Sequence, residues 1–538
     1  MPAEHALPLT SPEAVRDALR AGREIALIDV REEDPFAQAH PLFAAQLSLS
    51  RVEMDAPWRL PRREVPVVLY DDQGGSLALP VAEKLKGLGY TQVSLLADGL
   101  DGWQRSGGEL FRDVNVPSKS FGELVEHERH TPSLAAEEVK ALLDSGANMV
   151  VLDARRFDEY QTMSIPGGIS VPGAELALRV RTLAPDPTTQ VIVNCAGRTR
   201  SLIGTQSLIN AGIPNPVAAL RNGTIGWTLA GFELAHGEAT QAGPVDRSSR
   251  AAAREAAQAL AARAGVQRLD ESALLAPAPL GRTVYRYDVR SPEEFAAGHL
   301  PGFGSAPGGQ LVQETDVFAP VRGARIVLVD DDGVRAPMTA HWLAQMGWDV
   351  AYVADVSPTR FAHRSPWPPK TPSPAVPSIS VAELAEALPE GRTVVIDLTA
   401  SARHVQRHIP GAWWALRAEL PAVLPQIAAA LPQPPSRIVL TCGSSELARF
   451  AAADLARETD TPVLVLEGGN TAWFTAGQPA ETGAQRLASP RTDRYRRPYE
   501  GTDNPREAMQ GYLDWEYGLV AQLASDGTHG FKVLQAAG

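Results

Sequence analysis

The sequence has only two cysteines among 538 residues, Cys195 and Cys442. Two cysteines in so long a chain cannot form a disulfide framework, which favours a reducing compartment. The formal net charge of −13 argues against nucleic acid or an anionic membrane as the main partner. The chain also lacks a run of about 18 apolar residues, which a membrane-spanning helix needs, and its first residues lack the pattern of a secretory signal. We therefore expect a cytoplasmic protein that binds neither nucleic acid nor membrane.

What the chain does contain is one pattern repeated four times. An aspartate ends an apolar stretch at Asp29, Asp153, Asp288 and Asp397. Eleven residues later stand His40, Ser164, His299 and His408, and the last three are followed by Ile-Pro-Gly or Leu-Pro-Gly. A second apolar stretch ends 42 residues after the aspartate in three units and 45 residues after it in the last, at Asp71, Cys195, Asp330 and Cys442. Such spacing indicates four homologous units.

The units define the expected domain organisation. Each alternates short Val/Ile/Leu stretches with amphipathic helical stretches, which predicts an α/β fold with a central, mostly parallel sheet flanked by helices. We place unit one at residues 1–122, unit two at 123–248, unit three at 249–372 and unit four at 373–490, followed by a helical C-terminal tail at 491–538. A connector helix is expected at 251–264, an extended Pro-rich segment at 365–378, and a tail helix at 505–523 that buries Tyr512, Trp515, Tyr517 and Leu519 on a neighbouring unit.

The segment around Cys195 has the features of a reactive-thiol site. A short apolar stretch ends at the cysteine, and Ala196, Gly197, Arg198, Thr199, Arg200 and Ser201 lead into an expected helix. Ligands of parallel sheets bind at the carboxyl ends of strands. A helix N-terminus and nearby guanidiniums lower the pKa of a thiol, so we expect Cys195 to be ionised at neutral pH. Cys442 has the same frame without an arginine in its loop, and is the second candidate.

These motifs carry a family resemblance. Asp153-Ala154-Arg155, Ile165-Pro166-Gly167, the Cys195–Arg200 loop and Gly223–Trp227, with similar strings in the other units, resemble the rhodanese (sulfurtransferase) family. The resemblance covers nearly all of residues 1–490 and implies four tandem rhodanese-like domains. Units one and three are degenerate, with Asp71 and Asp330 at the cysteine position. Unit two is catalytic through Cys195. Ser164 stands where the family usually has histidine, so we expect a packing role at that position.

The resemblance implies a thiosulfate sulfurtransferase. Cys195 would attack the outer sulfur of thiosulfate, and its persulfide would pass that sulfur to cyanide or a thiol. Arg198 and Arg200 would bind the donor's oxygens, Thr199 and Ser201 would donate hydroxyl hydrogen bonds, and the amides from Ala196 to Arg200 would hold the anion. We expect no cofactor or metal beyond the covalent persulfide. The expected partners are a small-molecule donor and acceptor, with a sulfur-relay protein as a further candidate.

Two alternatives stay open at this point. The chain fits a persulfide carrier or scaffold that docks partner proteins through its degenerate units. A cysteine phosphatase is the other alternative, although that chemistry uses a Cys-x5-Arg loop and the sixth residue after Cys195 is Ser201, with Arg200 one position too early. Arg155 and Glu159, four residues apart, are expected to form a structural ion pair.

Overall fold

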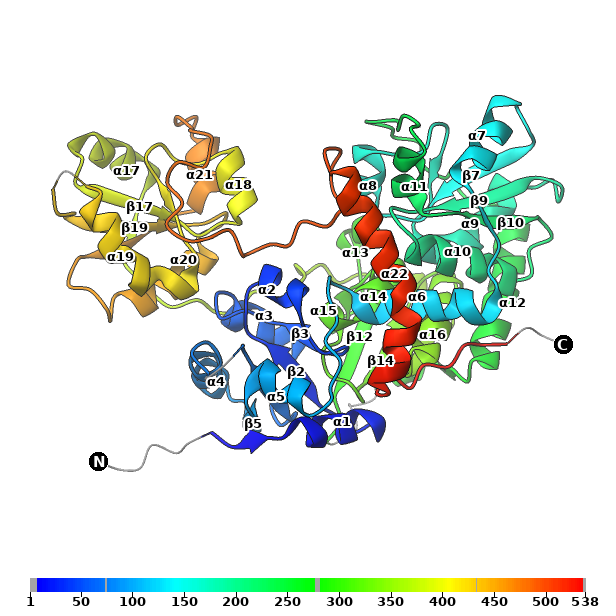
Figure 1. Ribbon diagram of the computed structural model, residues 1–538, viewed down its shortest axis with the longest axis horizontal. Helices are drawn as coiled ribbons and strands as arrows, with labels where there is room; N and C mark the ends of the chain where they lie inside the picture. The colour runs from blue at the N-terminus through cyan, green and yellow to red at the C-terminus, as the bar shows by residue number, and fades with distance from the viewer. Residues whose placement is uncertain (1–6, 73–74, 276–280, 432, 536–538) are drawn as a thin grey trace.

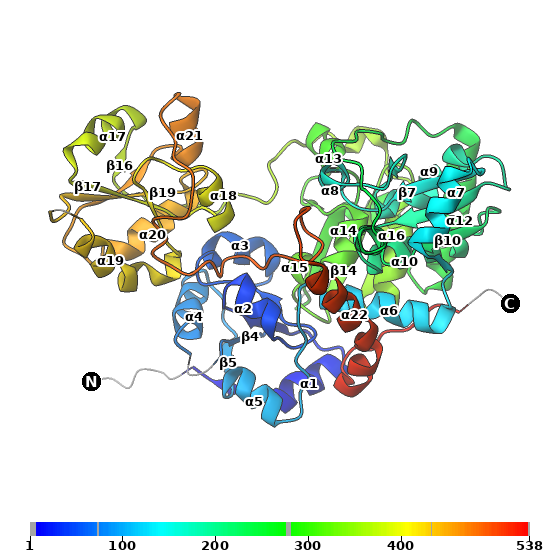
Figure 2. The same ribbon diagram turned by 45° about the horizontal axis from the view of Figure 1, so that its top comes forward.

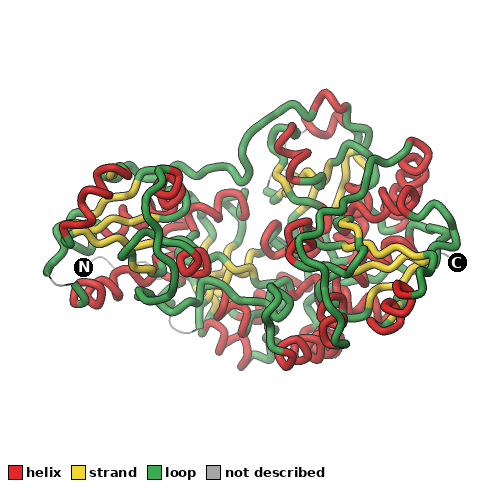
Figure 3. The backbone as a smooth tube through the Cα atoms, turned by 90° about the horizontal axis from the view of Figure 1, so that it is seen from above, coloured by secondary structure: helices red, strands yellow, loops and turns green. Residues whose placement is uncertain are grey.

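The computed structural model describes residues 7–72, 75–275, 281–431 and 433–535. Each unit contains one five-stranded sheet, and every strand pair in the four sheets is parallel. The four sheets share one strand order, which in unit two is β6-β10-β9-β7-β8. In Figure 3 the strands gather in separate sheets, each wrapped by helices. The predicted fold class is therefore confirmed.

The strands of units one and two occupy equivalent positions in the two repeats. Unit one has β1 (Leu9–Thr10), β2 (Ala26–Asp29), β3 (Ala45–Gln46), β4 (Val67–Tyr70) and β5 (Val93–Leu96), with helices α1 (Pro12–Arg20), α2 (Glu33–Gln38), α3 (Val52–Arg59), α4 (Ala78–Gly87) and α5 (Gly99–Arg105). Unit two has β6 (Ser133–Leu134), β7 (Met149–Asp153), β8 (Ile169–Ser170), β9 (Gln190–Asn194) and β10 (Val217–Leu220), with α7 (Ala136–Asp144), α8 (Phe157–Thr162), η1 (Gly173–Glu175), α9 (Leu176–Leu183), α10 (Thr199–Asn210) and α11 (Gly223–Leu229). Between them, α6 (Val116–Arg129) runs through the predicted boundary at residue 122.

Units three and four repeat the same plan. Unit three has β11 (Gln267–Leu269), β12 (Val284–Asp288), β13 (Gly304–Ser305), β14 (Arg325–Val329) and β15 (Asp349–Val353), with α13 (Pro292–Ala297), α14 (Gly308–Gln313), α15 (Thr315–Phe318) and α16 (Arg335–Gln345). Unit four has β16 (Ser378–Ile379), β17 (Thr393–Asp397), β18 (Trp413–Trp414), β19 (Arg437–Thr441) and β20 (Val463–Leu466), with α17 (Val381–Ala387), α18 (Ser401–Gln406), α19 (Leu420–Ala429), α20 (Glu446–Leu455) and α21 (Gly469–Thr475). The expected connector and tail helices are α12 (Arg247–Arg263) and α22 (Arg506–Asp526).

The repeated aspartate holds the turn that follows the second strand of each sheet. In unit two, Arg155 donates to Asp153 from Nε at 2.9 Å and from Nη2 at 2.7 Å, and it also donates to the carbonyl oxygen of Met163. Units one and three repeat this pair as Asp29–Arg31 and Asp288–Arg290. The predicted Arg155–Glu159 ion pair is therefore wrong, because the guanidinium folds back onto the carboxylate two residues before it.

The position of the repeated histidine has a packing role, as predicted. The backbones of His40, Ser164, His299 and His408 each form an isolated β-bridge to a later segment of the same unit. Ser164 is fully buried and makes this bridge to Ala235 although it has no imidazole. The conserved element at this position is therefore the backbone pairing.

The four units pack against one another through buried polar contacts. Unit two meets unit three where the indole N–H of Trp342 donates to Ser207 at 2.7 Å. Unit four meets unit one through Arg417, whose guanidinium donates to Glu53 at 2.7 and 2.8 Å and to Asp454 at 2.6 Å. Figure 1 shows unit four, in yellow and orange, beside unit one and away from units two and three.

The tail crosses the other units and ends far from unit four. Figures 1 and 2 both show α22 crossing α6, and Tyr512, Leu519 and Leu523 of α22 are buried. Before the helix, the Thr492 carbonyl accepts from Asp34 in unit one, and after it the Lys532 amide donates to Gln345 in unit three. Packing on neighbouring units is confirmed, but Tyr517 is 52% exposed rather than buried. No helix among the described residues is long and apolar enough to cross a membrane.

We predict that Arg417→Met destabilises the contact between units one and four. The change removes the buried guanidinium that makes two hydrogen bonds to Glu53, and Glu53 keeps Lys84, at 2.7 Å, so the loss of hydrogen bonds to a charged group costs about 2 kcal/mol. Thermal unfolding should show a lower Tm, whereas Arg457→Met, at an exposed position of unit four, serves as the matched control. An unchanged Tm for Arg417→Met would contradict the role assigned to this contact.

Candidate active site

Cys195 lies directly after β9, the central strand of the unit-two sheet, and is 2% exposed. Val191, Ile192 and Val193 bring it there because their side chains are fully buried on both faces of the sheet. The cysteine carbonyl accepts from the Thr224 amide at 2.9 Å. Gly223, with φ of +53°, must be glycine, because a Cβ there would lie 2.2 Å from the Cys195 carbonyl oxygen. The glycine of the Gly–Trp motif therefore packs against the cysteine loop.

Ser201, at the start of α10, contacts the sulfur. The thiol Sγ lies 3.3 Å from the Ser201 hydroxyl oxygen, to which it donates. The Ser201 amide also hydrogen-bonds the sulfur, and the Ser201 hydroxyl donates to the Arg198 carbonyl at 2.8 Å. The loop therefore closes around one sulfur atom. The Thr199 hydroxyl, by contrast, has no hydrogen-bond partner among the described residues.

The degenerate units show what this loop binds. In unit one the Asp71 carboxylate accepts from the amides of Leu77 at 3.0 Å and Ala78 at 3.2 Å. In unit three the Asp330 carboxylate accepts from the amides of Gly333 at 2.9 Å and Ala336 at 2.7 Å. The same amide contacts the strand-end side chain in units one, two and three. It belongs to the residue six positions after Asp71, Cys195 or Asp330. The loop is therefore an anion-holding nest, filled by a carboxylate in units one and three and by a thiol in unit two.

Arg200 is held beside the site by a carboxylate. Its two terminal nitrogens donate to Glu159 at 2.7 and 2.9 Å. Glu159 is half-buried. Its burial opposes ionisation, but the Arg200 guanidinium outweighs this effect and lowers the pKa of Glu159 to about 2. Unit three repeats the pair as Arg335 and Glu294. The Arg200 charge is also the strongest charge effect that favours the Cys195 thiolate.

Arg198 points away from the sulfur, toward α6 and the tail. It donates to both oxygens of Glu123 at 2.7 and 2.9 Å and also contacts Glu126. The Tyr517 hydroxyl lies 3.0 Å from its Nη1, and the Tyr517 ring stacks 4.2 Å from the guanidinium carbon. The structure therefore brings Arg200 and Ser201 to the reactive atom, while Arg198 braces the loop against its surroundings.

The tail helix covers the loop from outside. A Cβ on Gly197 would lie 3.1 Å from the Tyr512 ring and 3.4 Å from Oε2 of Glu516. Glu516 is fully buried, and Tyr512 donates to its Oε1 at 2.7 Å, whereas Oε2 has no partner among the described residues. Burial raises the pKa of Glu516 to about 8, against the opposing charge of Lys119. A carboxyl that is mostly neutral at pH 7 therefore faces the cysteine loop.

The predicted ionisation of Cys195 is wrong for this closed arrangement. Burial raises the pKa of the thiol, and Glu516 adds to this effect, while Arg200 and Ser201 oppose it without overcoming burial. The sequence showed the cations, but the tail that removes water from the sulfur comes some 300 residues later in the chain. Exposure to water would remove the main cause of the raised pKa.

Cys442 lies at the equivalent strand end of unit four and is 4% exposed. Its carbonyl accepts from the Asn470 amide at 2.7 Å, and a Cβ on Gly469 would lie 2.1 Å from that oxygen. The loop has no arginine of its own. Arg51 of unit one lies near Cys442, but its guanidinium pairs with Asp55 at 2.9 Å.

Several site residues could not be found from the local motif. Glu123, Tyr512 and Glu516 reach the Cys195 loop from α6 and α22, and Arg51 reaches Cys442 from α3. One signal in the sequence indicated such a contact. The aromatic residues of the tail helix predicted that this helix packs on a neighbouring unit, but not on which one. No set of three or more His, Cys, Asp or Glu side chains among the described residues could hold a metal ion.

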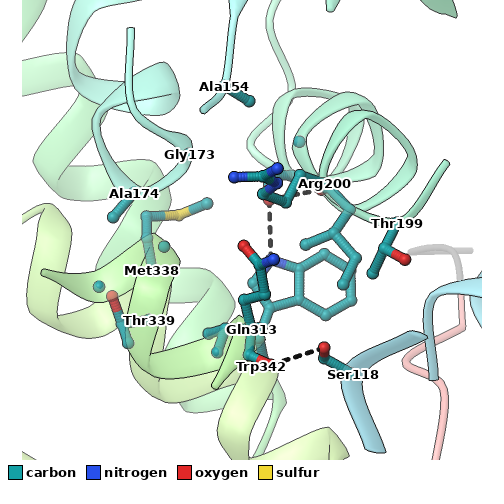
Figure 4. Close-up of a pocket in the computed structure, with 16 residues that line it drawn as sticks. Ser118, Ala154, Gly173, Ala174, Thr199, Arg200, Gln313, Met338, Thr339 and Trp342 are labelled. Carbon is teal, nitrogen blue, oxygen red and sulfur yellow. Dashed lines mark hydrogen bonds between the residues drawn. The ribbon is translucent and has the colours of Figure 1, made fainter. Parts of the chain in front are cut away.

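Two cavities adjoin the site, and Arg200 lines both. One is narrow, about 40 Å³, and lies between units two and three. Figure 4 shows Met338, Thr339 and Trp342 of α16 facing Arg200 and Thr199 of α10 across it. The other is polar, about 440 Å³, and lies where unit two, unit three and the tail meet.

Comparison with known proteins agrees with this geometry. The family model described as "Rhodanese-like domain" matches residues 11–106, 135–230, 280–356 and 380–476. A solved structure of thiosulfate sulfurtransferase from Pseudomonas aeruginosa is 62% identical, covers 98% of this chain and 100% of its own, and superposes with a TM-score of 0.96. The comparison with curated proteins gives no match.

More distant solved structures add nothing to the assignment. Wild-type EanB is 15% identical over 67% of this chain and 99% of its own, with a TM-score of 0.23. A rhodanese-related protein from Thermoplasma volcanium is 18% identical over 20% of this chain and 97% of its own, with a TM-score of 0.17.

The chain has four parallel sheets of one strand order. In units one, two and three the loop after the central strand directs amide groups at the strand-end side chain, which is a carboxyl group in units one and three and a thiol in unit two. These features define a class of tandem α/β proteins. With the family model matching all four repeats, the chain belongs to the rhodanese family.

We predict that Glu516→Gln lowers the pKa of the Cys195 thiol, because the ionised carboxylate opposes the thiolate. In a Cys442→Ala background, the alkylation rate of Cys195 should be nearly unchanged near pH 7, where Glu516 is mostly neutral, and should rise by roughly two- to tenfold above pH 8, where Glu516 is ionised in the wild type. Glu507→Gln, at an exposed position near the start of α22, is the control. A pH profile of alkylation that is unchanged in Glu516→Gln would refute the coupling.

We further predict that Tyr512→Ala opens the Cys195 loop. Its ring packs closest to Gly197, so its removal admits water and reagents to the sulfur. In the same Cys442→Ala background, modification by an aromatic disulfide reagent should accelerate by about tenfold or more. Gln510→Ala is the control, because Gln510 lies on the exposed side of the same helix. Tyr517 is also exposed but contacts Arg198, so Tyr517→Ala is not used as the control. Equal reactivity in the wild type and Tyr512→Ala would count against the tail as the cover.

Proposed function

We propose that this chain is a thiosulfate sulfurtransferase in which Cys195 carries the transferred sulfur as a persulfide. The observation that carries the proposal is the equivalence of the three loops: where units one and three hold a carboxylate against the loop amides, unit two holds a thiol. A nest that binds an anion stabilises a thiolate and a persulfide anion in the same place. The relative from Pseudomonas aeruginosa, 62% identical, supports thiosulfate as the donor.

The first half-reaction begins at the sulfur. The Cys195 thiol first loses its proton to water that enters when the loop is exposed, since burial is the main cause of its raised pKa. The thiolate then attacks the outer sulfur of thiosulfate, a new S–S bond forms to Sγ, and the S–S bond within thiosulfate breaks. The electron pair of that bond leaves with sulfite. Ser201 binds the cysteine sulfur through its amide and hydroxyl, and the Arg200 charge favours the anionic forms of the site.

The second half-reaction returns the enzyme to its starting state. Cyanide or a thiolate attacks the outer sulfur of the persulfide, and the bond to Sγ breaks with its electron pair remaining on Cys195. Thiocyanate or an organic persulfide is released. The reaction proceeds without a resident cofactor or metal in this scheme, and two unpaired cysteines suit a reducing, cytoplasmic setting.

Of the loop residues predicted to bind substrate, Arg200 and Ser201 have the strongest support. We assign Ala196, Gly197 and Thr199 to the wall of the nest, with the unpartnered Thr199 hydroxyl as a free donor. We assign Arg198 to bracing, since Glu123 and Glu126 hold it. Cys442 is a second candidate nucleophile, with Arg51 of unit one nearby.

We predict that Cys195→Ala abolishes transfer of sulfur from thiosulfate to cyanide, whereas Cys442→Ala retains most of it. Loss of the nucleophile should lower kcat by about a thousandfold or more, measured as thiocyanate formed. Intact mass and peptide mapping after treatment with thiosulfate should place one added sulfur atom on Cys195. Thiocyanate production that survives Cys195→Ala would transfer the role to Cys442. Hydrolysis of a phosphoester by the wild type, lost in Cys195→Ala, would favour the phosphatase alternative instead.

A further inference from the structure

The reaction described above needs access to Cys195, and the closed structure gives almost none. The cysteine is 2% exposed, and Tyr512 and Glu516 of α22 lie against Gly197 of its loop. Figures 1 and 2 show α22 at the surface of the molecule, and one side of the helix is exposed along its length. A movement of α22 therefore exposes the sulfur without any change in the sheet of unit two.

The two halves of α22 are held by different parts of the molecule. The half at 506–517 packs in a small hydrophobic cluster with α11. The buried members of this cluster are Ile225, Met509, Tyr512 and Leu513. The half at 519–526 packs through Leu519 and Leu523 in the large hydrophobic core of units one and three, and these are the most fully buried apolar side chains of the helix. Since burial of apolar area stabilises packing, the second half is the more firmly held.

The chain is fixed after α22 and has room before it. After the helix, the Phe531 ring packs edge-on against Phe43 and Phe121, with centroids 6.0 and 5.3 Å apart. Before the helix, Tyr499 and Gly501 line two cavities of about 350 and 440 Å³. Close packing therefore ties the end of the second half, whereas the segment that leads into the first half lies beside open space.

A lysine holds the first half closed. Lys119 of α6 is buried, pairs with Asp113 at 2.7 Å, and places its ammonium 5.0 Å from the centre of the Tyr512 ring. The rings of Tyr499 and Trp515 lie 5.4 and 5.5 Å from the same nitrogen. Cations are attracted to the faces of aromatic rings. These contacts form a latch that binds the first half of α22, and the segment before it, to α6.

Gly518 stands at the junction of the two halves. It lies inside the helix and is exposed, and a Cβ there would meet no other part of the described structure within 4 Å. Packing therefore does not require a glycine at this position. Gly511, inside the first half, is exposed and equally free of neighbours among the described residues. Glycine weakens a helix where it stands, and helices bend at such residues. Gly518 therefore places a weak point between the lightly held half and the anchored half.

We propose that residues 506–517 are a lid that swings about Gly518 to uncover Cys195, while residues 519–526 stay anchored. In the closed state the latch holds the lid over the cysteine loop. In the open state water takes the proton of the Cys195 thiol, and thiosulfate reaches the sulfur. The inference rests on the proposed function for the identity of the donor, and it adds the movement that admits this donor.

The test replaces the two glycines of α22 one at a time in the Cys442→Ala background. Alanine stiffens the hinge, so Gly518→Ala should slow the alkylation of Cys195 by iodoacetamide about two- to fivefold. Gly511→Ala is the matched control, because it makes the same change at an exposed position within the lid and should leave the rate unchanged. Trp515→Leu removes one ring of the latch and should raise the rate about threefold or more.

Turnover gives a second readout in the same variants. Thiocyanate formation is measured with thiosulfate as the donor and cyanide in excess. Because thiosulfate enters through the open lid, kcat/KM for thiosulfate should fall in Gly518→Ala by the same factor as the alkylation rate. Gly511→Ala should keep the kcat/KM of the parent protein.

Several outcomes would overturn the proposal. Equal slowing in both glycine variants would mean that the whole helix unfolds to release the loop, and no slowing in either would mean that α22 leaves as one rigid body. Unchanged alkylation in Trp515→Leu would remove the latch. Slower alkylation in Gly518→Ala with an unchanged kcat/KM would mean that thiosulfate enters by another route. Absence of thiocyanate in the wild type, with the expected alkylation rates, would refute the proposed function and leave the lid in place.

Discussion

The central feature of this protein is a set of backbone amides at the end of the middle strand in the sheets of units one, two and three. Amides that point inward need an electron-rich partner, because buried N–H groups are costly to leave unpaired. Units one and three supply that partner from their own chain, as Asp71 and Asp330. Unit two supplies a sulfur atom, which exchanges its bonding partner during a reaction in a way that a carboxylate does not. The loops of units one, two and three therefore direct amide groups at one shared position, which holds a carboxyl group in two of them and a thiol in the third.

Much of the fold and the positions of the loops could be predicted from the sequence, because the repeated motifs consist of residues that are close together in the chain. Apolar stretches that end in Asp153 or Cys195, the Pro-Gly turns and the Gly–Trp pairs specify strands, turns and loops from neighbouring residues alone. The helices expected at 251–264 and 505–523 are α12 and α22, with each end displaced by one to four residues. The domain boundaries stay a prediction, since α6 crosses the first of them.

Charge was harder to predict, because spacing along the chain does not show which groups meet in space. The sequence predicted two cations, Arg198 and Arg200, beside the thiol. In the structure each forms an ion pair, Arg198 with Glu123 and Arg200 with Glu159. Glu123 comes from another helix and Glu516 from the tail. The environment of Cys195 is thus set by burial and by carboxyl groups distant in sequence.

The route of the tail has a consequence for how the molecule is made. Unit two leaves the ribosome some 300 residues ahead of α22, and domains fold as they emerge. During that interval the Cys195 loop exists without Tyr512 and Glu516 above it. Burial of the sulfur is therefore a late event in biosynthesis, and the nascent chain passes through a stage in which its most reactive atom is open to oxidants and electrophiles.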